Sequence, residues 1–340
     1  MSAMREIVQS PYRPLGAASV SAGTSTPTRS GHSPAVRVAN VISFDVEEHD
    51  RIEAAVGLPC SPELKANYAA RMEATTRRLL DQLAAAKVTA TFYIVGEIAR
   101  NHPKLVRDIF AAGHEIGSHS WDHRRIHQFT PASFREDLRK SKDVLEQTIG
   151  ATVFGFRAPT FSLMRETWWA IDALAECGFE YDSSIFPVRH DRYGLPTAPR
   201  VPFVAQGRER EILELPPLTY RVAGMNLPVA GGGYFRLFPL AVMRAGLRQA
   251  ARSEVPQVGM LYFHPWEFDP DQPKLPLGRL ARWRTYVGVG RTTDRLAQLL
   301  GEFRFRRAID TVRELRANSD DLPRFQVDAT DCEPRPQGRG

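Results

Sequence analysis

The chain has 340 residues, 43% hydrophobic and 25% charged, which is the composition of a globular protein with room for a large buried core. No apolar run approaches the roughly 18–20 residues of a membrane span, and no signal-peptide core is expected in the N-terminal stretch. The net charge of +6 raises nucleic acid as a partner, but the arginines are scattered and follow no nucleic-acid-binding pattern. We therefore expect no nucleic-acid partner, whereas an anionic glycan or a membrane face fits the basic charge.

The two ends of the chain differ in composition from its middle. Residues 1–35 and 318–340 are rich in Ser, Pro, Gly and charged residues and show no periodicity, so they predict disordered tails. Residues 36–317 predict the folded part. The three cysteines are odd in number and far apart, which predicts no disulfide framework and, with the absent signal sequence, indicates the cytoplasm.

Strand-like apolar runs alternate with amphipathic segments between these tails. This rhythm predicts an α/β fold with a parallel sheet, in which active sites gather at the C-terminal ends of the strands. Strands are expected within residues 37–46, 88–96, 114–120, 153–159, 179–185, 211–217 and 258–268. Helices are expected over residues 63–87, 102–113, 131–149, 166–177, 239–253 and 291–302.

Five of the expected strands end in residues that can bind metal, move protons or hold charge. A single such ending is explained by a strand that runs out into water, but five at one edge of a sheet are difficult to explain by solvation. These residues are Asp45 and Glu47 after the first strand, His119 and His123 after the third, and Arg157, Asp182 and His264 after later ones.

The two carboxylates of the first strand are spaced i, i+2. On a regular strand Asp45 and Glu47 therefore point to the same side. Two carboxylates on one side repel unless a cation or a proton lies between them. One interpretation is a solvated strand end, and the other is a metal ligand beside a general base.

The stretch "GHEIGSHSWDH" supplies three histidines. The helical His-Glu-x-x-His pattern is excluded, because His114 and His119 are five apart with Gly117 between them. His114 is expected to be structural. His119 and His123 are four apart across a strand-to-loop turn, and with one carboxylate they form the ligand set of a catalytic zinc. Hydrogen-bonded structural histidines are the alternative.

An arginine and a histidine follow two further strands. Burying Arg157 is costly without a carboxylate partner, and Asp45 is the natural one. His264 follows a fully apolar strand and could donate a proton near neutral pH, with Glu267 as its partner or as a rim charge. A structural ion pair and a satisfied core histidine are the alternatives.

Aromatic residues cluster in the last third of the chain. Tyr234, Phe235, Phe263 and Trp266 could line a sugar-binding groove or belong to the core. The preceding glycine run lacks the strand–loop–helix context of a phosphate site, so no phosphate binding is predicted.

The ordered set "SFDVE", "HEIGSHSWDH", "FRAP", "YDSS" and "FHPWE" resembles the polysaccharide deacetylases, the nodulation-type homology domain of carbohydrate esterase family 4. It looks closest to the branch associated with exosortase and exopolysaccharide gene clusters, which carries an extra C-terminal region, here about residues 220–317. The resemblance implies a distorted (β/α) barrel with about seven parallel strands and a divalent metal, most often zinc. It also implies hydrolysis of N-acetyl groups on amino sugars of a polysaccharide or its lipid-linked precursor.

The same resemblance assigns roles to individual residues. Asp45 would be the general base, His264 the acid, and Arg157 would orient Asp45. The metal ligands would be Glu47, His119 and His123, and the substrate-binding residues Pro159, Asp182, Tyr234 and Trp266. Asp182 could also tune His264.

The first motif departs from the family pattern. Val46 stands where many members have a second aspartate, so the acid comes one residue later, as Glu47. Glu48 and His49 are rival ligands.

The sequence is also compatible with other functions. A cyclic amide could be the substrate of the same metal site, or the chain could be a non-catalytic glycan-binding module. A two-carboxylate glycosidase explains neither the histidine pair nor Arg157. Peripheral association with a membrane export system is compatible with the basic charge, and the oligomeric state is left open.

Overall fold

The computed structural model describes residues 40–190, 192–253, 258–317 and 321–327. The tail predicted over residues 1–35 lies outside the described residues, and so does Cys332. Within the described residues, none of the helices combines the length and the apolar character needed to cross a bilayer.

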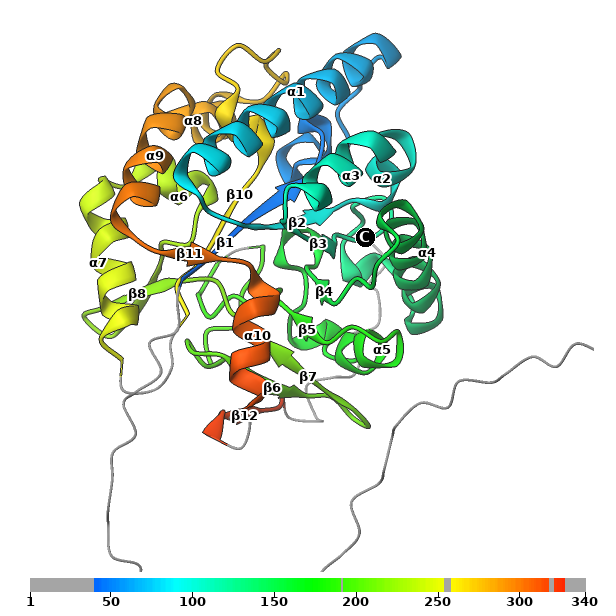
Figure 1. Cartoon of the computed structure of the whole chain (residues 1–340), viewed down its shortest axis with the longest axis vertical. Coiled ribbons are helices and arrows are strands. Elements are labelled where there is room, and N and C mark those ends of the chain that lie inside the picture. Colours follow the sequence, from blue (N-terminus) through cyan, green and yellow to red (C-terminus); the bar gives the residue numbers. More distant parts are fainter. Residues whose placement is uncertain (1–39, 191, 254–257, 318–320, 328–340) are drawn as a thin grey trace, which may run out of the picture. The chain divides into compact units, whose positions relative to one another are not determined.

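Seven parallel strands form the centre of the fold, as predicted. Their spatial order is β10-β1-β2-β3-β4-β5-β7 (Figure 1), so neighbours in the sheet are mostly neighbours in the chain. Each strand is short and almost fully buried, because helices cover the outer face. The bounds are β1 Asn40–Val46, β2 Thr91–Ile94, β3 Glu115–Ser118, β4 Gly155–Phe156, β5 Tyr181–Asp182, β7 Glu211–Glu214 and β10 Met260–Phe263.

The two ends of this run of strands meet. Beyond β7, Pro217 forms a parallel bridge with Met260 of β10, and the Leu218 N–H donates to the Met260 carbonyl at 3.0 Å. This contact closes the strands into a distorted barrel, in agreement with the predicted fold class. The remaining strands lie at its margins: β6 (Phe203–Gln206), the hairpin of β8 (Thr219–Val222) and β9 (Met225–Pro228), β11 (Phe305–Arg306) and β12 (Arg324–Phe325).

The predicted C-terminal tail is partly wrong. Within residues 318–340, β12 pairs in parallel with β6, and Leu322 and Val327 are buried. Phe325 packs edge-on against Trp168 and Phe203, with ring centroids 5.7 Å apart in both pairs. A polar composition hid these three apolar residues, and the ring partners of Phe325 lie more than a hundred residues earlier.

The helices follow the expected pattern where they are long. The predicted helix over 131–149 has these bounds, with the Thr130 hydroxyl accepting from the Ser133 N–H and Gly150 left-handed at its end. Four short helices were not predicted (α2, α6, α8 and α10), because one or two turns leave too little periodicity to detect. The helices of the described residues are α1 Pro62–Ala86, α2 Gly96–Asn101, α3 Pro103–Ala111, α4 Pro131–Ile149, α5 Ala170–Glu176, α6 Gly232–Leu237, α7 Leu240–Ala251, α8 Arg279–Tyr286, α9 Thr292–Glu302 and α10 Ala308–Arg316.

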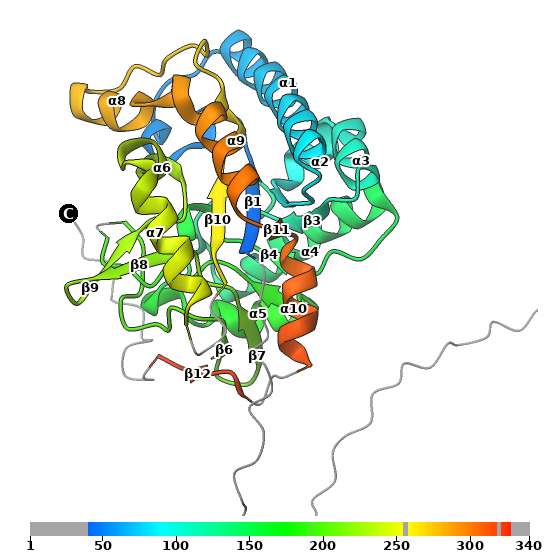
Figure 2. The same ribbon diagram turned by 60° about the vertical axis from the view of Figure 1, so that its left-hand side comes forward.

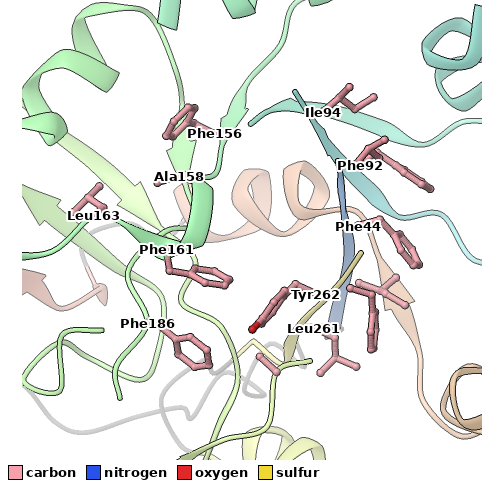
Figure 3. Packing of buried hydrophobic residues seen from close by; sticks show 14 of the residues in the cluster. Phe44, Phe92, Ile94, Phe156, Ala158, Phe161, Leu163, Phe186, Leu261 and Tyr262 are labelled. Atoms are coloured by element: carbon pink, nitrogen blue, oxygen red, sulfur yellow. The ribbon is translucent and has the colours of Figure 1, made fainter. Parts of the chain in front are cut away.

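Alternation along β1 separates core from site. Phe44 points outward and stacks on Phe92 with ring centroids 5.1 Å apart, whereas Tyr262, on the neighbouring strand β10, lies on the other side (Figure 3). Ser43 and Asp45, the neighbours of Phe44 on the strand, point to the opposite face, into the barrel. One strand thus anchors the outer core and delivers a carboxylate to the interior.

A buried carboxylate closes the N-terminal end of the barrel. Glu115 of β3 accepts hydrogen bonds from the Thr91 hydroxyl at 2.7 Å, the Tyr181 hydroxyl at 2.8 Å and the Ile309 N–H at 2.9 Å. Ile309 belongs to the first turn of α10, whose position is shown in Figures 1 and 2. Glu115 therefore fastens α10 to the barrel.

We expect Glu115→Ala to lower the free energy of unfolding by about 3 kcal/mol, because three buried donors lose their acceptor. Urea unfolding followed by circular dichroism measures this. The exposed Glu136 of α4 provides the control, and Glu136→Ala should change stability by less than about 0.5 kcal/mol. Equal losses in both variants would contradict the fastening role.

Candidate active site

A cavity of about 140 Å³ lies where the predicted strand ends converge. It is bordered by residues from β1, from the loops after β3 and β4, and from the loop after β10. The first and last of these segments are more than two hundred positions apart in sequence. Six of the predicted site residues line it: Asp45, Glu47, His119, His123, His264 and Trp266.

Three of these residues form a metal-ligand cluster. One ligand atom each from Glu47, His119 and His123 lies within 4.8 Å of the other two. Glu47 Oε2 and His123 Nε2 are 2.5 Å apart, yet this oxygen has no hydrogen bond with good geometry to any described residue. His119 Nδ1 lies 2.8 Å from the Arg157 carbonyl, so Nδ1–H donates there and Nε2 keeps its lone pair. This donor set fits a divalent cation.

The rival ligands are engaged elsewhere. Glu48 is paired with Arg51 at 2.5 Å, and His49 Nε2 lies 2.8 Å from the Tyr286 hydroxyl. His114 accepts a hydrogen bond from the Ala90 N–H at 3.0 Å, in the structural role predicted for it. Glu47 is thus the acid that joins the two histidines.

Electrostatics keep the cluster in its ligating form. Burial alone would raise the pKa of Glu47, but the neighbouring His123, His264 and His119 hold this pKa far below its usual range. Burial, reinforced by His123, lowers the pKa of His119 to about 4, against the attraction of Asp45. A carboxylate and a neutral imidazole are the forms that bind metal.

The loop that carries the histidines has an uncommon backbone. Ser120 and His123 adopt positive φ values of 66° and 68°, which turn His123 back toward His119. Asp137 of α4 secures this loop, because its carboxylate accepts from the Ser120 hydroxyl at 2.8 Å and the Trp121 N–H at 3.1 Å. Sequence reasoning missed Asp137, since an acid inside an amphipathic helix looks like a solvent-facing residue.

Arg51 joins the two ligand-bearing loops and was also missed. It pairs with Glu48, the neighbour of Glu47, and with Glu97 at 3.0 Å. It also donates to the carbonyl of Asp122, the neighbour of His123, at 3.0 Å. One guanidinium thereby holds the backbone on both sides of the cluster.

The predicted pairing of Asp45 with Arg157 is confirmed. The fully buried guanidinium donates to Asp45 Oδ1 at 2.7 Å, to the Ser43 hydroxyl at 2.8 Å and to the Ser183 hydroxyl at 2.9 Å. The second Asp45 oxygen, Oδ2, lies 3.9 Å from His264 Nε2. Arg157 leaves Asp45 one oxygen directed at the cavity.

His264 is held by an acid from its own loop. Its Nδ1–H donates to Glu267 at 2.8 Å, and Glu267 is in turn paired with the buried Arg236 at 2.8 Å. Burial would lower the pKa of His264, but the bond to Glu267 and the charges of Glu47, Glu267 and Asp45 raise it to about 9. At neutral pH the imidazole is therefore protonated.

Asp182 does not occupy either predicted role. It is fully buried, it does not line the cavity, and Glu267 rather than Asp182 partners His264. Its carboxylate accepts from the Ser184 hydroxyl at 2.5 Å, and Ser184 accepts from the Ala158 N–H at 2.7 Å. Through Ser184, Asp182 therefore supports the backbone of Ala158, which lines the cavity.

The predicted substrate-binding aromatic residues divide into two groups. Trp266 lines both the metal cavity and an adjoining cavity of about 510 Å³, and Tyr234 lines the latter. Phe235 and Phe263 are fully buried core residues. Pro159 is buried and precedes two residues of positive φ, so it shapes the wall without lining the cavity.

A second carboxylate lies against Asp182. Glu214 is its register partner on β7, and Asp182 Oδ2 and Glu214 Oε2 have no other donor among the described residues. Burial raises the pKa of Asp182 to about 6, while burial and Asp182 raise the pKa of Glu214 well above its usual value. The pair therefore retains a proton that the unfolded chain releases near pH 4.

The consequence is a stability that falls as the pH rises. The folded state binds the shared proton more tightly than the unfolded chain does. The contribution of this proton to the free energy of unfolding is therefore complete below about pH 4 and is lost as the pH passes through about 6 and above. In Glu214→Gln an amide N–H replaces this proton permanently. Relative to wild type, the variant should gain at least about 1 kcal/mol between about pH 5 and about pH 8. Urea unfolding at both pH values measures it, with Glu136→Gln as control; a difference independent of pH would refute the shared proton.

The family profile of the polysaccharide deacetylases matches residues 66–181, and that of the domain of unknown function DUF3473 matches residues 183–313. The first region holds His119, His123 and Arg157, and the second holds His264. Residues 66–181 of the chain therefore belong to the polysaccharide deacetylase family.

Curated relatives match only part of the chain. The uncharacterized protein YlxY of Bacillus subtilis is 35% identical over 99 residues, which are 29% of this chain and 30% of YlxY. A peptidoglycan-N-acetylglucosamine deacetylase of Bacillus cereus is 29% identical over 98 residues, 28% of this chain and 36% of the relative. The chain thus spans about a third of the length of these proteins.

Solved structures match more of the fold. A Mycobacterium smegmatis protein assigned to the polysaccharide deacetylases superposes with a TM-score of 0.56 and 21% identity, covering 92% of this chain and 99% of its own. The allantoinase PuuE superposes with a TM-score of 0.56 and 17% identity, covering 83% and 91%. These likenesses show the fold.

Proposed function

We propose that the protein is a metal-dependent hydrolase that removes N-acetyl groups from amino sugars of a polysaccharide or its lipid-linked precursor. One observation supports the proposal most directly. Glu47, His119 and His123 form a cluster that could hold a divalent cation, and this cluster lies in the same cavity as Asp45 and His264. Relatives named as peptidoglycan and chitin deacetylases support an acetylated amino sugar as the substrate class. A role in exopolysaccharide biosynthesis is part of the proposal.

Zinc is the proposed metal. Two imidazoles and one carboxylate are a ligand set typical of catalytic zinc, which leaves coordination positions open. A bound zinc ion would polarise the acetamide carbonyl and lower the pKa of water at the site. Glu47, His119 and His123 would hold it.

The remaining residues divide the proton transfers between them. Asp45, with one oxygen fixed by Arg157, accepts the proton of the attacking water on Oδ2. His264 carries its proton on Nε2, directed into the cavity, because Glu267 holds Nδ1. It gives this proton to the departing amine, since an amide nitrogen leaves poorly without one.

A second candidate is a cyclic amide as substrate. The fold likeness to an allantoinase favours testing it, because a ring-opening amide hydrolysis needs the same kinds of groups. The adjoining cavity of about 510 Å³, lined by Trp266 and Tyr234, favours the longer glycan.

The test is acetate release from acetylated glucosamine oligosaccharides and from peptidoglycan fragments, with allantoin hydrolysis measured in parallel. We expect acetate release that a chelator abolishes and zinc restores. Allantoin hydrolysis without acetate release would establish the second candidate. If the protein showed neither activity, a non-catalytic binding module would be the remaining function.

Asp45→Asn and His264→Gln should each lower kcat/KM for acetate release at least about a hundredfold, because each removes one proton-transfer group. Asp143→Asn and His127→Gln alter exposed residues outside the cavity and should stay near the wild-type rate. Near-normal turnover in a folded Asp45 or His264 variant would remove that residue from the mechanism.

Metal content tests the cluster without measuring activity. After dialysis against limiting zinc, Glu47→Gln and His123→Gln should bind it at least about tenfold more weakly than wild type. Glu53 lines the same cavity outside the cluster, so Glu53→Gln is the matched control. Mass spectrometry of the eluted metal measures the zinc content of each variant. Equal zinc affinity in all variants would show that the ion binds elsewhere.

A further inference from the structure

Helix α8 presents a basic and apolar surface that the proposed chemistry does not explain. The side chains of Leu280 and Trp283 are three positions apart on this helix, and the residues are 62% and 54% exposed. A tryptophan and a leucine this exposed on one helical turn are uncommon on a surface that meets only water. Figures 1 and 2 show α8 at the periphery of the fold, near α6 and α9.

The charge of this surface has one sign. Residues 274–293 contain five basic residues and no acidic one. Arg279, Arg282 and Arg284 are all exposed, and none of them forms an ion pair with another described residue. Most other arginines of the described chain that lie on helices are paired, for example Arg77 with Glu73 and Arg135 with Glu176.

The helix is anchored at one end. Arg236 donates to the Thr285 carbonyl at 2.5 Å and to the Val287 carbonyl at 3.1 Å. The Tyr286 hydroxyl accepts from the Leu275 N–H at 2.7 Å and bonds to His49. The turn with Leu280 and Trp283 therefore projects from a fixed base, so its exposure does not result from a loose helix end.

We infer that α8 docks on an anionic lipid surface. Indole rings and leucine side chains partition into the boundary between headgroups and acyl chains, and arginines beside them attract anionic headgroups. This short helix therefore combines apolar partitioning with electrostatic attraction. The defined docking surface consists of Arg279, Leu280, Arg282, Trp283 and Arg284.

Two other occupants fit less well. A second copy of this chain, related by a two-fold axis, would bring the same unpaired arginines against each other. An acidic glycan bound in the adjoining cavity would use Leu280 and Arg284, which line it, but it would not account for Trp283, which does not. A lipid surface uses all five residues.

Docking would bring the site close to the membrane. Leu280 and Arg284 line the cavity of about 510 Å³, which shares Trp266 with the metal cavity. The inference itself does not depend on the proposed activity, because binding to lipid is measured without substrate.

The test is cosedimentation of the full chain with vesicles of phosphatidylcholine alone and of phosphatidylcholine mixed with phosphatidylglycerol. We expect binding to the anionic vesicles that salt weakens, and little binding to the neutral ones. Substituting Arg279, Arg282 and Arg284 together by Gln should lower the partition coefficient about a hundredfold. The double variant Leu280→Ser, Trp283→Ser should lower it about tenfold.

Matched variants control for charge and exposure. Substituting Arg107, Arg139 and Arg248 by Gln removes the same charge from exposed sites on α3, α4 and α7. Met225→Ser removes an equally exposed apolar side chain, 62% exposed, from β9. Both controls should bind anionic vesicles nearly as wild type, and circular dichroism verifies that every variant is folded.

Three outcomes would overturn the inference. The first is no binding to anionic vesicles by the wild-type chain. The second is an equal loss in the α8 variants and their controls, which would show attraction by net charge alone. The third is α8-dependent binding to dextran sulfate without vesicle binding, which would assign the surface to a soluble acidic polymer.

Discussion

The pairing of Arg157 with Asp45 inside the barrel is the interaction on which the site depends. A guanidinium without solvent contact is tolerated only when its donors are satisfied, and here two serine hydroxyls, a backbone carbonyl and one carboxylate satisfy them. The backbone carbonyl of the same residue fixes the tautomer of His119. One residue therefore aims the proposed base with its side chain and a proposed metal ligand with its main chain.

A second chain of charges runs to the other side of the cavity. His264 is held by Glu267, Glu267 by Arg236, and Arg236 by the carbonyls that end α8. The hydrogen bond that orients His264 thus comes from groups that do not line the metal cavity. The same carbonyls fix the base of the helix whose outer turn forms the proposed docking surface. The proposed chemistry and the proposed docking thus share one structural support.

The site also explains why neither matched region suffices alone. Asp45 and Glu47 precede the polysaccharide deacetylase region, and His264 follows it within the region of unknown function. Barrel closure between the end of β7 and β10 brings these segments together. The later region thus supplies both the strand that completes the barrel and the proposed acid, which gives it a structural role in the site.

Local patterns in the sequence predicted seven apolar strands, the bounds of α4, and six polar side chains at or directly after strand ends. These side chains belong to Asp45, Glu47, His119, His123, Arg157 and His264. Periodicity and motif spacing are local, so they survive in one dimension. The three-dimensional structure showed which acid joins the histidines, that Glu267 rather than Asp182 holds His264, and that Arg324–Phe325 form a strand. Those outcomes depend on distances between segments far apart in the chain and on left-handed residues such as His123, which no local pattern encodes.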